Sequence, residues 1–179
     1  MLNLGTPYTR HDPDNKYWDA DGFRVMRPVG TKYVTGLVAW CEAIPEHQRG
    51  ILIEIGTYLA ESTIIHAHYF RRVITIDPLT NEPGLYAEMM RRIEPYPNIE
   101  HIRGFSTEVI PTLGPADAFY IDGNHRPGAV NMDILCCEAH GGNYIGGHDY
   151  IEGGGLAEVV HRHFSEVQTF KDMSWLAIV

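Results

Sequence analysis

Four ionisable residues of the kinds that bind cations and move protons lie close together in the second half of the chain. Asp122 and His125 follow one apolar segment, and His148 and Asp149 follow the next. Two carboxylates and two imidazoles suit a divalent cation, either Mg²⁺ or a softer transition metal. An imidazole also titrates near neutral pH and is able to act as a general base. The alternative is that the two histidines orient a substrate without any metal.

A second group of residues lies in a short turn in the first half of the chain. The segment EIGTYLAEST, residues 54–63, contains Gly56, which permits a tight turn close to a ligand. A dinucleotide-binding turn has the pattern G-x-G-x-x-G, whereas this segment has a single glycine. The turn is therefore a poor cradle for a diphosphate and suits a smaller adenosine ligand with a zwitterionic tail. Ser62 lies in the first turn of the following helix, whose amide end favours electron-rich groups.

Asp77 ends the next apolar run, about 20 residues after Gly56. A carboxylate at the end of the second strand is able to accept hydrogen bonds from both ribose hydroxyls of an adenosine. The alternative is that Asp77 caps a helix that starts beside Pro78.

Apolar runs alternate with helical patterns from residue 31 onward, and this alternation must position the polar residues. Continuous apolar strands that alternate with helices predict an α/β fold with a parallel sheet covered on both faces. The last two runs are separated by one residue, so they must pair as an antiparallel hairpin. We predict strands at 51–56, 73–77, 98–104, 116–122, 143–147, 166–172 and 174–179, and helices at 31–44, 60–70, 82–93, 106–113, 128–139 and 156–164.

Four segments, in this order, resemble class I S-adenosylmethionine (SAM) dependent methyltransferases: EIGTYLAEST, VITIDP, YIDGNH and GGNYIGGHDY. The most similar group is methyltransferase family 24, which is related to macrocin-type O-methyltransferases. The resemblance spans residues 31–179, and its most specific pieces are I-D-G-x-H and G-G-H-D-Y. It implies a Rossmann-like sandwich whose seven-stranded, mostly parallel sheet has the order 3-2-1-4-5-7-6 and ends in an antiparallel hairpin.

The resemblance also implies which residues hold the methionine and ribose portions of SAM. Glu54 and Gly56 are expected beside the methionine portion, with Ser62 nearby, and Asp77 is expected on the ribose. One departure from the family is Ala60, where many members have glycine.

For the remaining portions, the resemblance implies that residues 104–106, including Ser106, line the adenine and that Asp122 lies close to the sulfonium. Macrocin-type enzymes hold Mg²⁺ with an acid after strand four and paired acids after strand five. Asp122 and Asp149 match two of these positions, whereas His148 replaces the first acid of the pair. The candidate metal ligands are therefore Asp122, His148 and Asp149, with the identity of the cation left open.

The leading hypothesis is methyl transfer from SAM to a hydroxyl oxygen of a small-molecule acceptor, assisted by a divalent cation if one binds. Asp122, His125 and His148 are the candidate catalytic residues, with one of the two histidines as the general base. Two alternatives remain open. One is a metal-dependent hydrolase that uses the same Asp/His cluster, and the other is a non-catalytic SAM-binding subunit.

The amino-acid composition disfavours some classes of binding partner and indicates a location in the cell. The chain has 23 acidic and 14 basic residues, for a formal charge of −9, which disfavours nucleic acid and an anionic membrane surface. Three cysteines without paired spacing suit a reducing compartment, so the cytoplasm is the expected location. No stretch reaches the ~20 apolar residues of a membrane span.

Two regions are expected along the chain: an N-terminal arm at 1–30, which is a candidate lid, and a single methyltransferase domain at 31–179. The small domain leaves open a homodimer in which the partner completes the acceptor pocket. The histidine pairs His66/His68 and His161/His163 lie two residues apart on helices and do not share a face. We expect these four to be solvated or individually hydrogen-bonded.

Overall fold

The structure is a computed structural model that describes residues 19–20, 23–24, 31–79 and 83–179. Two short strands, β1 (Asp19–Ala20) and β2 (Phe23–Arg24), pair antiparallel within the predicted N-terminal arm. The rest of that arm lies outside the described residues, so its role as a lid stays a prediction.

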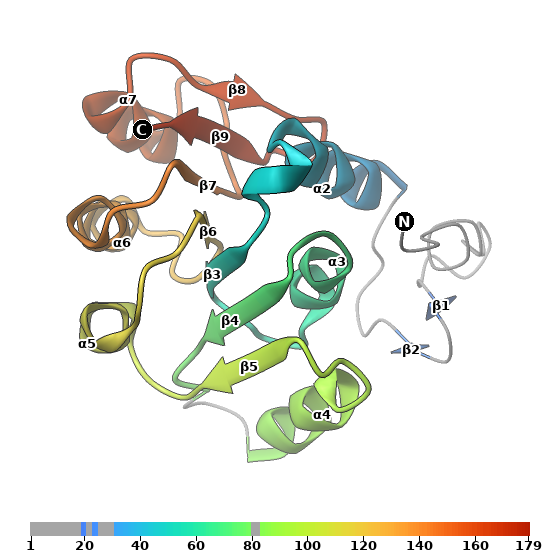
Figure 1. The fold of residues 1–179 in the computed structure, drawn as a ribbon. Helices are drawn as coiled ribbons and strands as arrows, with labels where there is room; N and C mark the ends of the chain where they lie inside the picture. The colour runs from blue at the N-terminus through green and yellow to red at the C-terminus, as the bar shows by residue number, and fades with distance from the viewer. Residues whose placement is uncertain (1–18, 21–22, 25–30, 80–82) are drawn as a thin grey trace.

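The main sheet has seven strands in the order β5-β4-β3-β6-β7-β9-β8 (Figure 1). The first five of these pair in parallel, and β9 pairs antiparallel with both β7 and β8. Counted within this sheet, the order is 3-2-1-4-5-7-6, so the predicted Rossmann-like architecture is confirmed. The strands are β3 (Ile51–Ile55), β4 (Arg72–Ile76), β5 (Ile99–Ile102), β6 (Ala118–Ile121), β7 (Tyr144–Gly147), β8 (Gln168–Thr169) and β9 (Trp175–Ile178).

Helices cover both faces of the sheet, with α2, α3 and α4 on one side and α5, α6 and α7 on the other (Figure 1). This double cover explains why the central strands are continuously apolar rather than alternating. The α helices are α2 (Thr31–Ala43), α3 (Glu61–Tyr69), α4 (Pro83–Ile93), α5 (Ser106–Val109), α6 (Pro127–His140) and α7 (Gly155–His163), and the 3-10 turns are Glu46–Gln48 and Ile110–Thr112.

Successive residues of each central strand point to opposite faces and enter two separate cores. On β3, Ile53 packs with the α6 and α7 side chains, including Ile134 and Val160. Its neighbour Leu52 packs on the other face with Leu37 and Trp40 of α2. Because side chains alternate along a strand, Glu54 lies on the same face of β3 as Leu52 and faces α2 and α3.

Two predicted elements differ from the structure. The strand expected at 166–172 contains only two residues, because residues 170–174 form the turn of the hairpin. Phe170 N donates to Ser174 O, and Met173 adopts a φ of 73°. The helix expected at 106–113 changes to a 3-10 turn at Ile110, because Pro111 has no amide hydrogen to continue an α-helix.

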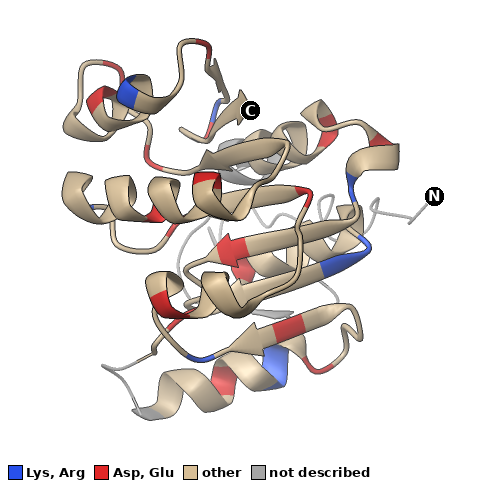
Figure 2. Cartoon of the chain, turned by 60° about the vertical axis from the view of Figure 1, so that its left-hand side comes forward, with Lys and Arg blue, Asp and Glu red and all other residues tan. Residues whose placement is uncertain are grey.

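Acidic residues are spread over all the described α helices, whereas basic residues are confined to some of them. Each of the six described α helices carries at least one acidic residue, whereas Lys or Arg occurs only in α2, α4 and α7 (Figure 2). Among the described helices, none is long and apolar enough to cross a membrane. The expectations about nucleic acid, membrane surfaces and location in the cell stay predictions.

The tight contact between β7 and β9 generates a stability prediction. A Cβ on Gly146 would overlap the carbonyl oxygen of Trp175 and the indole of Trp40, whose Nε1 donates to that same oxygen at 2.9 Å. We expect Gly146→Ala to lower the free energy of unfolding by about 1–3 kcal/mol, as overpacking does. Gly128→Ala is the control, because nothing lies within 4 Å of its added methyl group. Urea unfolding of both variants tests this, and an unchanged midpoint for Gly146→Ala would contradict it.

Candidate functional site

A cleft of about 630 Å³ opens at the carboxyl ends of the parallel strands. Its size falls within the range of small-molecule sites in proteins. In an open α/β sheet, this is the edge at which loops gather polar side chains around a ligand. The walls come from the turns after β3, β4, β5 and β6 and from α6, through residues 55–59, 61–62, 76–78, 104–107, 122–125, 129 and 132–133.

The turn after β3 depends on Gly56. Its φ of 96° lies in the region that favours glycine, and its N–H donates to Ile76 O at 2.8 Å. A Cβ at this position would overlap the carbonyl oxygen of Asp122. Ala60 precedes α3 with a φ of 60° and is fully buried. This is a left-handed conformation that glycine adopts at lower cost.

Asp77 lies in the cleft wall and ties two turns together. Its Oδ2 accepts hydrogen bonds from the backbone N–H groups of Thr57 and Tyr58, both at 3.0 Å. Its Oδ1 accepts one from Leu79 N at 2.9 Å. A carboxylate offers about four acceptor positions, so one remains on Oδ1. Among the described residues, no helix begins at Pro78 or Leu79, and the next described helix is α4.

Glu54 and Ser62 take different places relative to the cleft. Ser62 lines it, whereas Glu54 is completely buried behind it and is absent from its lining. The two are joined, because Ser62 Oγ donates to Glu54 Oε1 at 2.7 Å. Glu54 therefore reaches the cleft through Ser62 and does not face a ligand directly.

At another part of the wall, Ser106 pairs with a residue that the sequence analysis missed. Asp133 of α6 lines the cleft and accepts a hydrogen bond from Ser106 Oγ. Burial raises the pKa of the Asp133 carboxyl, and the hydrogen bond from Ser106 offsets part of that rise. The available signal was its position within the apolar stripe formed by Val130, Ile134 and Cys137, where a lone carboxylate needs a partner or a function.

Three large side chains of the cleft lining are exposed to it rather than packed away. Phe105 is 56% exposed, Met132 is 50% exposed and Tyr58 is 44% exposed. Exposed apolar surface inside a concave site is typical of ligand binding, because a flat apolar or aromatic ligand removes it from water.

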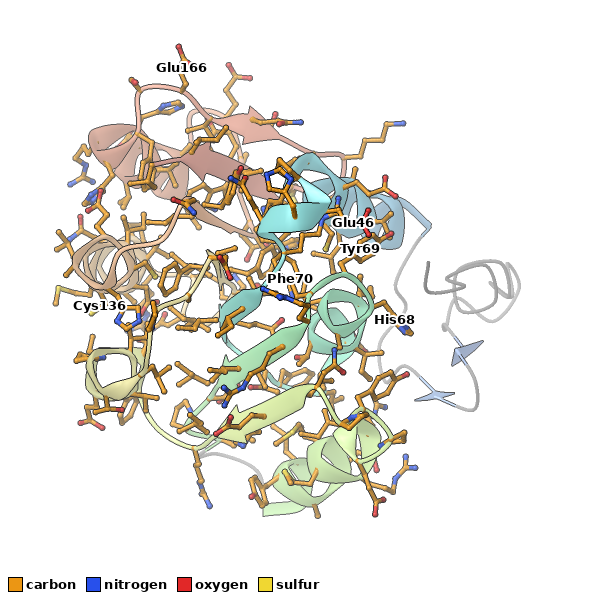
Figure 3. All side chains as sticks on the ribbon, viewed as in Figure 1. Glu46, His68, Tyr69, Phe70, Cys136 and Glu166 are labelled. Carbon is orange, nitrogen blue, oxygen red and sulfur yellow. The ribbon has the colours of Figure 1, made fainter. Side chains whose placement is uncertain are left out.

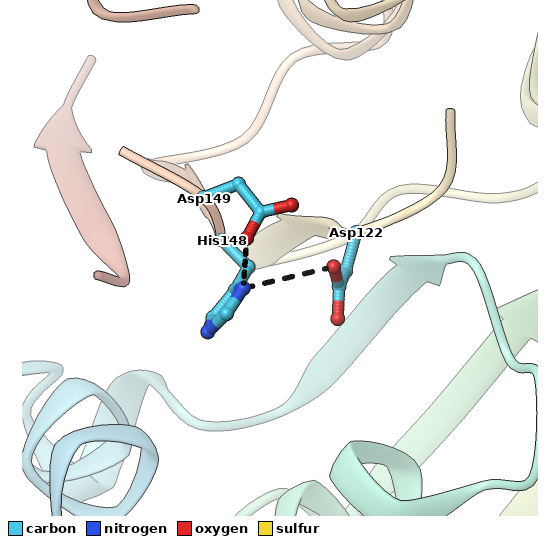
Figure 4. A group of neighbouring side chains, drawn as sticks. All are labelled: Asp122, His148 and Asp149. Carbon is cyan, nitrogen blue, oxygen red and sulfur yellow. Dashed lines mark hydrogen bonds and ion pairs between the residues drawn. The ribbon is translucent and has the colours of Figure 1, made fainter. Parts of the chain in front are cut away.

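The four predicted Asp and His residues meet at the ends of β6 and β7. Asp149 bridges the imidazoles, since its Oδ1 lies 2.9 Å from His148 Nδ1 and its Oδ2 contacts His125 Nδ1. Asp122 Oδ1 lies 3.9 Å from His125 Nε2 and 4.0 Å from His148 Nδ1. Figure 4 shows the Asp122 and Asp149 carboxylates approaching the same ring nitrogen of His148, Nδ1.

The cluster divides into an inner and an outer part. The His148 side chain is 12% exposed and does not line the cleft, whereas the His125 side chain is 53% exposed and does. One ligand atom each from Asp122, His148 and Asp149 lies within 4.8 Å of the others, which is a spacing that suits one metal ion. Asp149 has a φ of 60°, an uncommon conformation of the kind found at functional sites.

Three of the four histidines of the pairs His66/His68 and His161/His163 make hydrogen bonds of their own. His161 Nε2 pairs with the Tyr150 hydroxyl at 2.7 Å, and His163 bonds Glu138 and Asn131. His66 contacts Glu54 in the interior. The expectation is confirmed for these three residues, and His66 is also fully buried.

No model of a known protein family matches the chain, and no curated protein matches its sequence. Solved structures share its fold. The O-methyltransferase TomG from Streptomyces achromogenes, involved in tomaymycin synthesis and solved with SAM, gives a TM-score of 0.62 at 17% identity, over 84% of this chain and 81% of TomG. Cofactor-bound Rv0187 from MTB gives 0.58 at 23% identity, over 87% and 83%. An rRNA methylase from Streptococcus thermophilus gives 0.53 at 14% identity, over 80% and 90%. The TM-scores establish a shared fold, and sequence identities this low extend the similarity no further.

The buried Asp133 carboxyl generates a pH-dependent prediction. Because its pKa is higher in the folded than in the unfolded chain, its ionisation lowers stability as pH rises through the folded value. Asp133→Asn removes that cost and keeps an acceptor for Ser106. We expect the variant to melt higher than the wild type at about pH 8 and equally at about pH 4. Thermal unfolding at both pH values tests this, and a lower melting temperature at about pH 8 would contradict it.

Proposed function

We propose that the protein transfers the methyl group of SAM to a hydroxyl oxygen of a small-molecule acceptor. The observation that carries the proposal is the composition of the cleft. Its walls include the Gly56 turn and the Asp77 carboxylate after β3 and β4, while Asp122 and His125 line the same cleft after β6. A donor site and a proton-accepting group are thus parts of one cavity.

The residues of the cleft fit an adenosine-based donor. Asp77 has one acceptor position left for a ribose hydroxyl beyond its three backbone bonds. Phe105 and Met132 offer apolar surface to a purine, with Ser106 and Asp133 as polar neighbours. SAM supplies a methyl group that its sulfonium already activates. The main task of the protein is therefore alignment, which is worth up to about 7–11 kcal/mol.

His125 is the better placed of the two candidate bases. Its side chain is half exposed to the cleft, and its Nδ1 is held by the Asp149 carboxylate. A carboxylate on Nδ1 fixes the tautomer in which Nε2 carries no hydrogen and is able to accept a proton. We propose that Nε2 removes the acceptor's hydroxyl proton while Asp122 faces the imidazolium that forms.

Asp122, His148 and Asp149 are the residues that would hold a divalent cation. Such a cation would lower the pKa of a bound hydroxyl. Imidazole is a poor ligand for Mg²⁺ and a good one for ions such as Zn²⁺ or Fe²⁺, so His148 favours a transition metal over Mg²⁺. With a metal in place, His148 and the two carboxylates act as ligands, and His125 keeps its role as base.

The finer parts of the proposal draw on the sequence and on the structural neighbours. Methyltransferase family 24 is the proposed subtype, on the strength of the I-D-G-x-H and G-G-H-D-Y segments. TomG is an O-methyltransferase, whereas the Streptococcus protein is an rRNA methylase. The formal charge of −9 favours a small acceptor over RNA. A cytoplasmic location and a homodimer complete the proposal.

The cofactor claim predicts the effect of Asp77→Ala. Loss of a charged acceptor on the ribose should weaken binding of S-adenosylhomocysteine by about 10- to 100-fold, measured by titration calorimetry. Asp117→Ala is the matched control. The Asp117 carboxylate accepts a hydrogen bond from Ile51 N at 2.7 Å at the amino ends of β3 and β6, which is the opposite end of the strands from the cleft. The control should lose stability and retain affinity. Equal affinity of Asp77→Ala and the wild type would contradict the ribose contact.

The proton-transfer claim predicts the effects of His125→Gln and Asp149→Asn. Each should lower kcat by about 10²- to 10⁴-fold in a methyl-transfer assay against a panel of phenols, sugars and alcohols, and leave S-adenosylhomocysteine affinity within a few fold. His161→Gln is the control, since that imidazole bonds Tyr150 outside the cleft lining. Full activity of His125→Gln would assign the proton transfer to another group.

A metal-dependent hydrolase is the second candidate, and the cluster of Asp122, His148 and Asp149 favours it. It predicts cation-dependent hydrolysis of model esters and no heat of binding with SAM or S-adenosylhomocysteine. A SAM-binding subunit without activity predicts binding and no turnover with any acceptor.

A further inference from the structure

A polar group that the proposed mechanism does not use lies beneath the cleft. His66 Nδ1 donates to Glu54 Oε1 at 3.1 Å, and both side chains are completely buried. Glu54 is an interior strand residue, and His66 lies on the inner side of α3. The cost of burying two ionisable groups is high unless they pair and their remaining positions are satisfied.

The His66 ring is enclosed by aromatic side chains. Its centroid lies 5.5 Å from Trp40, 4.6 Å from Tyr120 and 6.5 Å from Phe70. Among the described residues, His66 Nε2 has no hydrogen-bond partner. The one polar contact of this ring is therefore made to Glu54. An aromatic ring without nitrogen would fill the same space, so packing alone does not require a histidine here.

Glu54 is held as an anion by its neighbours. Burial by itself would raise the pKa of its carboxyl, but the hydrogen bond from His66, the charge of that imidazole and the hydroxyls of Thr63 and Ser62 together lower it below its usual range. The other titratable groups close to this pocket are the Cys41 thiol, whose pKa is raised by burial, and the Tyr120 hydroxyl, which pairs with Ser174.

The carboxylate connects this pocket to the cleft. Ser62 Oγ donates to Glu54 Oε1 and Thr63 Oγ1 donates to Oε2. Both hydroxyls belong to the first turn of α3, and Ser62 lines the cleft together with Glu61. An ionised Glu54 accepts all three hydrogen bonds at once. A protonated Glu54 has fewer acceptor positions and one donor, which disrupts this arrangement.

We propose that His66 is a positioning residue for the donor site: by its contact with Glu54 it keeps that carboxylate ionised, and the carboxylate fixes Ser62 and the first turn of α3 against the bound donor. This inference rests on the proposed function. His66 acts through Glu54 and touches no ligand itself.

The test is titration calorimetry with S-adenosylhomocysteine from about pH 5.5 to about pH 8.5. Wild-type affinity should be nearly constant over this range. In His66→Phe, burial is no longer offset by the imidazole, so the Glu54 pKa rises and the affinity falls as pH decreases. Each unit by which that pKa exceeds the working pH corresponds to about a tenfold loss. His66→Asn keeps a donor toward Glu54 and should restore part of the affinity.

Two further variants make the result specific to the pair. Glu54→Gln should bind weakly at every pH, and adding His66→Phe to it should change the affinity little, because the carboxylate is already gone. His68→Phe is the matched control. His68 lies on the side of α3 away from the sheet, whereas Phe70 lies against it (Figure 3). His68→Phe should show the flat wild-type profile.

A loss of affinity in His66→Phe that is the same at all pH values, or no loss, would overturn the proposal and leave His66 a packing residue. Failure of the proposed function looks different, because the wild type itself would not bind S-adenosylhomocysteine. In that case the pair is tested by melting temperature against pH. His66→Phe should be less stable than the wild type, and this deficit should shrink as pH falls, because a Glu54 carboxyl with a raised pKa takes up a proton in the folded chain. Glu54→Gln should remove this dependence. A parallel loss at all pH values would again overturn it.

Discussion

The site depends on the close approach of the Gly56 turn to the end of β6. Gly56 N–H bonds to β4 at Ile76 O, and Asp122 N bonds to β3 at Ile55 O, both at 2.8 Å. There is no room for a side chain between the turn and the Asp122 carbonyl. These backbone contacts bring the ends of three strands together, so that Asp77 and Asp122 share one cleft although they are far apart in sequence. The remaining polar side chains are positioned relative to that frame.

Several residues in and around the site are held in arrangements that cost stability. Glu54 and His66 are fully buried ionisable groups, Asp133 is a buried carboxyl with a raised pKa, and Asp149 and Ala60 have left-handed backbone conformations. The two carboxyl groups are compensated locally, Glu54 by hydroxyl and imidazole donors and Asp133 by Ser106. Concentration of such costs around one cleft is typical of a functional site, where preorganisation matters more than maximum stability.

The fold could be predicted from the sequence because its signals are local. Continuous apolar runs separated by helical patterns require a covered parallel sheet, and the short spacing before residues 174–179 requires a hairpin. The hairpin strand at Gln168–Thr169 was overestimated, since nothing local shows where a turn takes over from an exposed edge strand. The convergence of Asp122, His125, His148 and Asp149 also followed from the strand ends. Burial of Glu54 behind Ser62, the partner of Ser106 and the role of His66 depend on which helix face meets which strand, and periodicity alone does not specify that.

The central claim is that the cleft binds an adenosine-based methyl donor, and a crystal structure with S-adenosylhomocysteine tests it most directly. The account predicts ligand density in the cleft, with a ribose hydroxyl on Asp77 and the purine between Phe105 and Met132, near Ser106 and Asp133. It also predicts that the thioether sulfur lies on the side of Asp122 and His125. Density at another place on the molecule, or an empty cleft at saturating ligand, would contradict the claim and leave the Asp/His cluster to be explained as the centre of a different reaction.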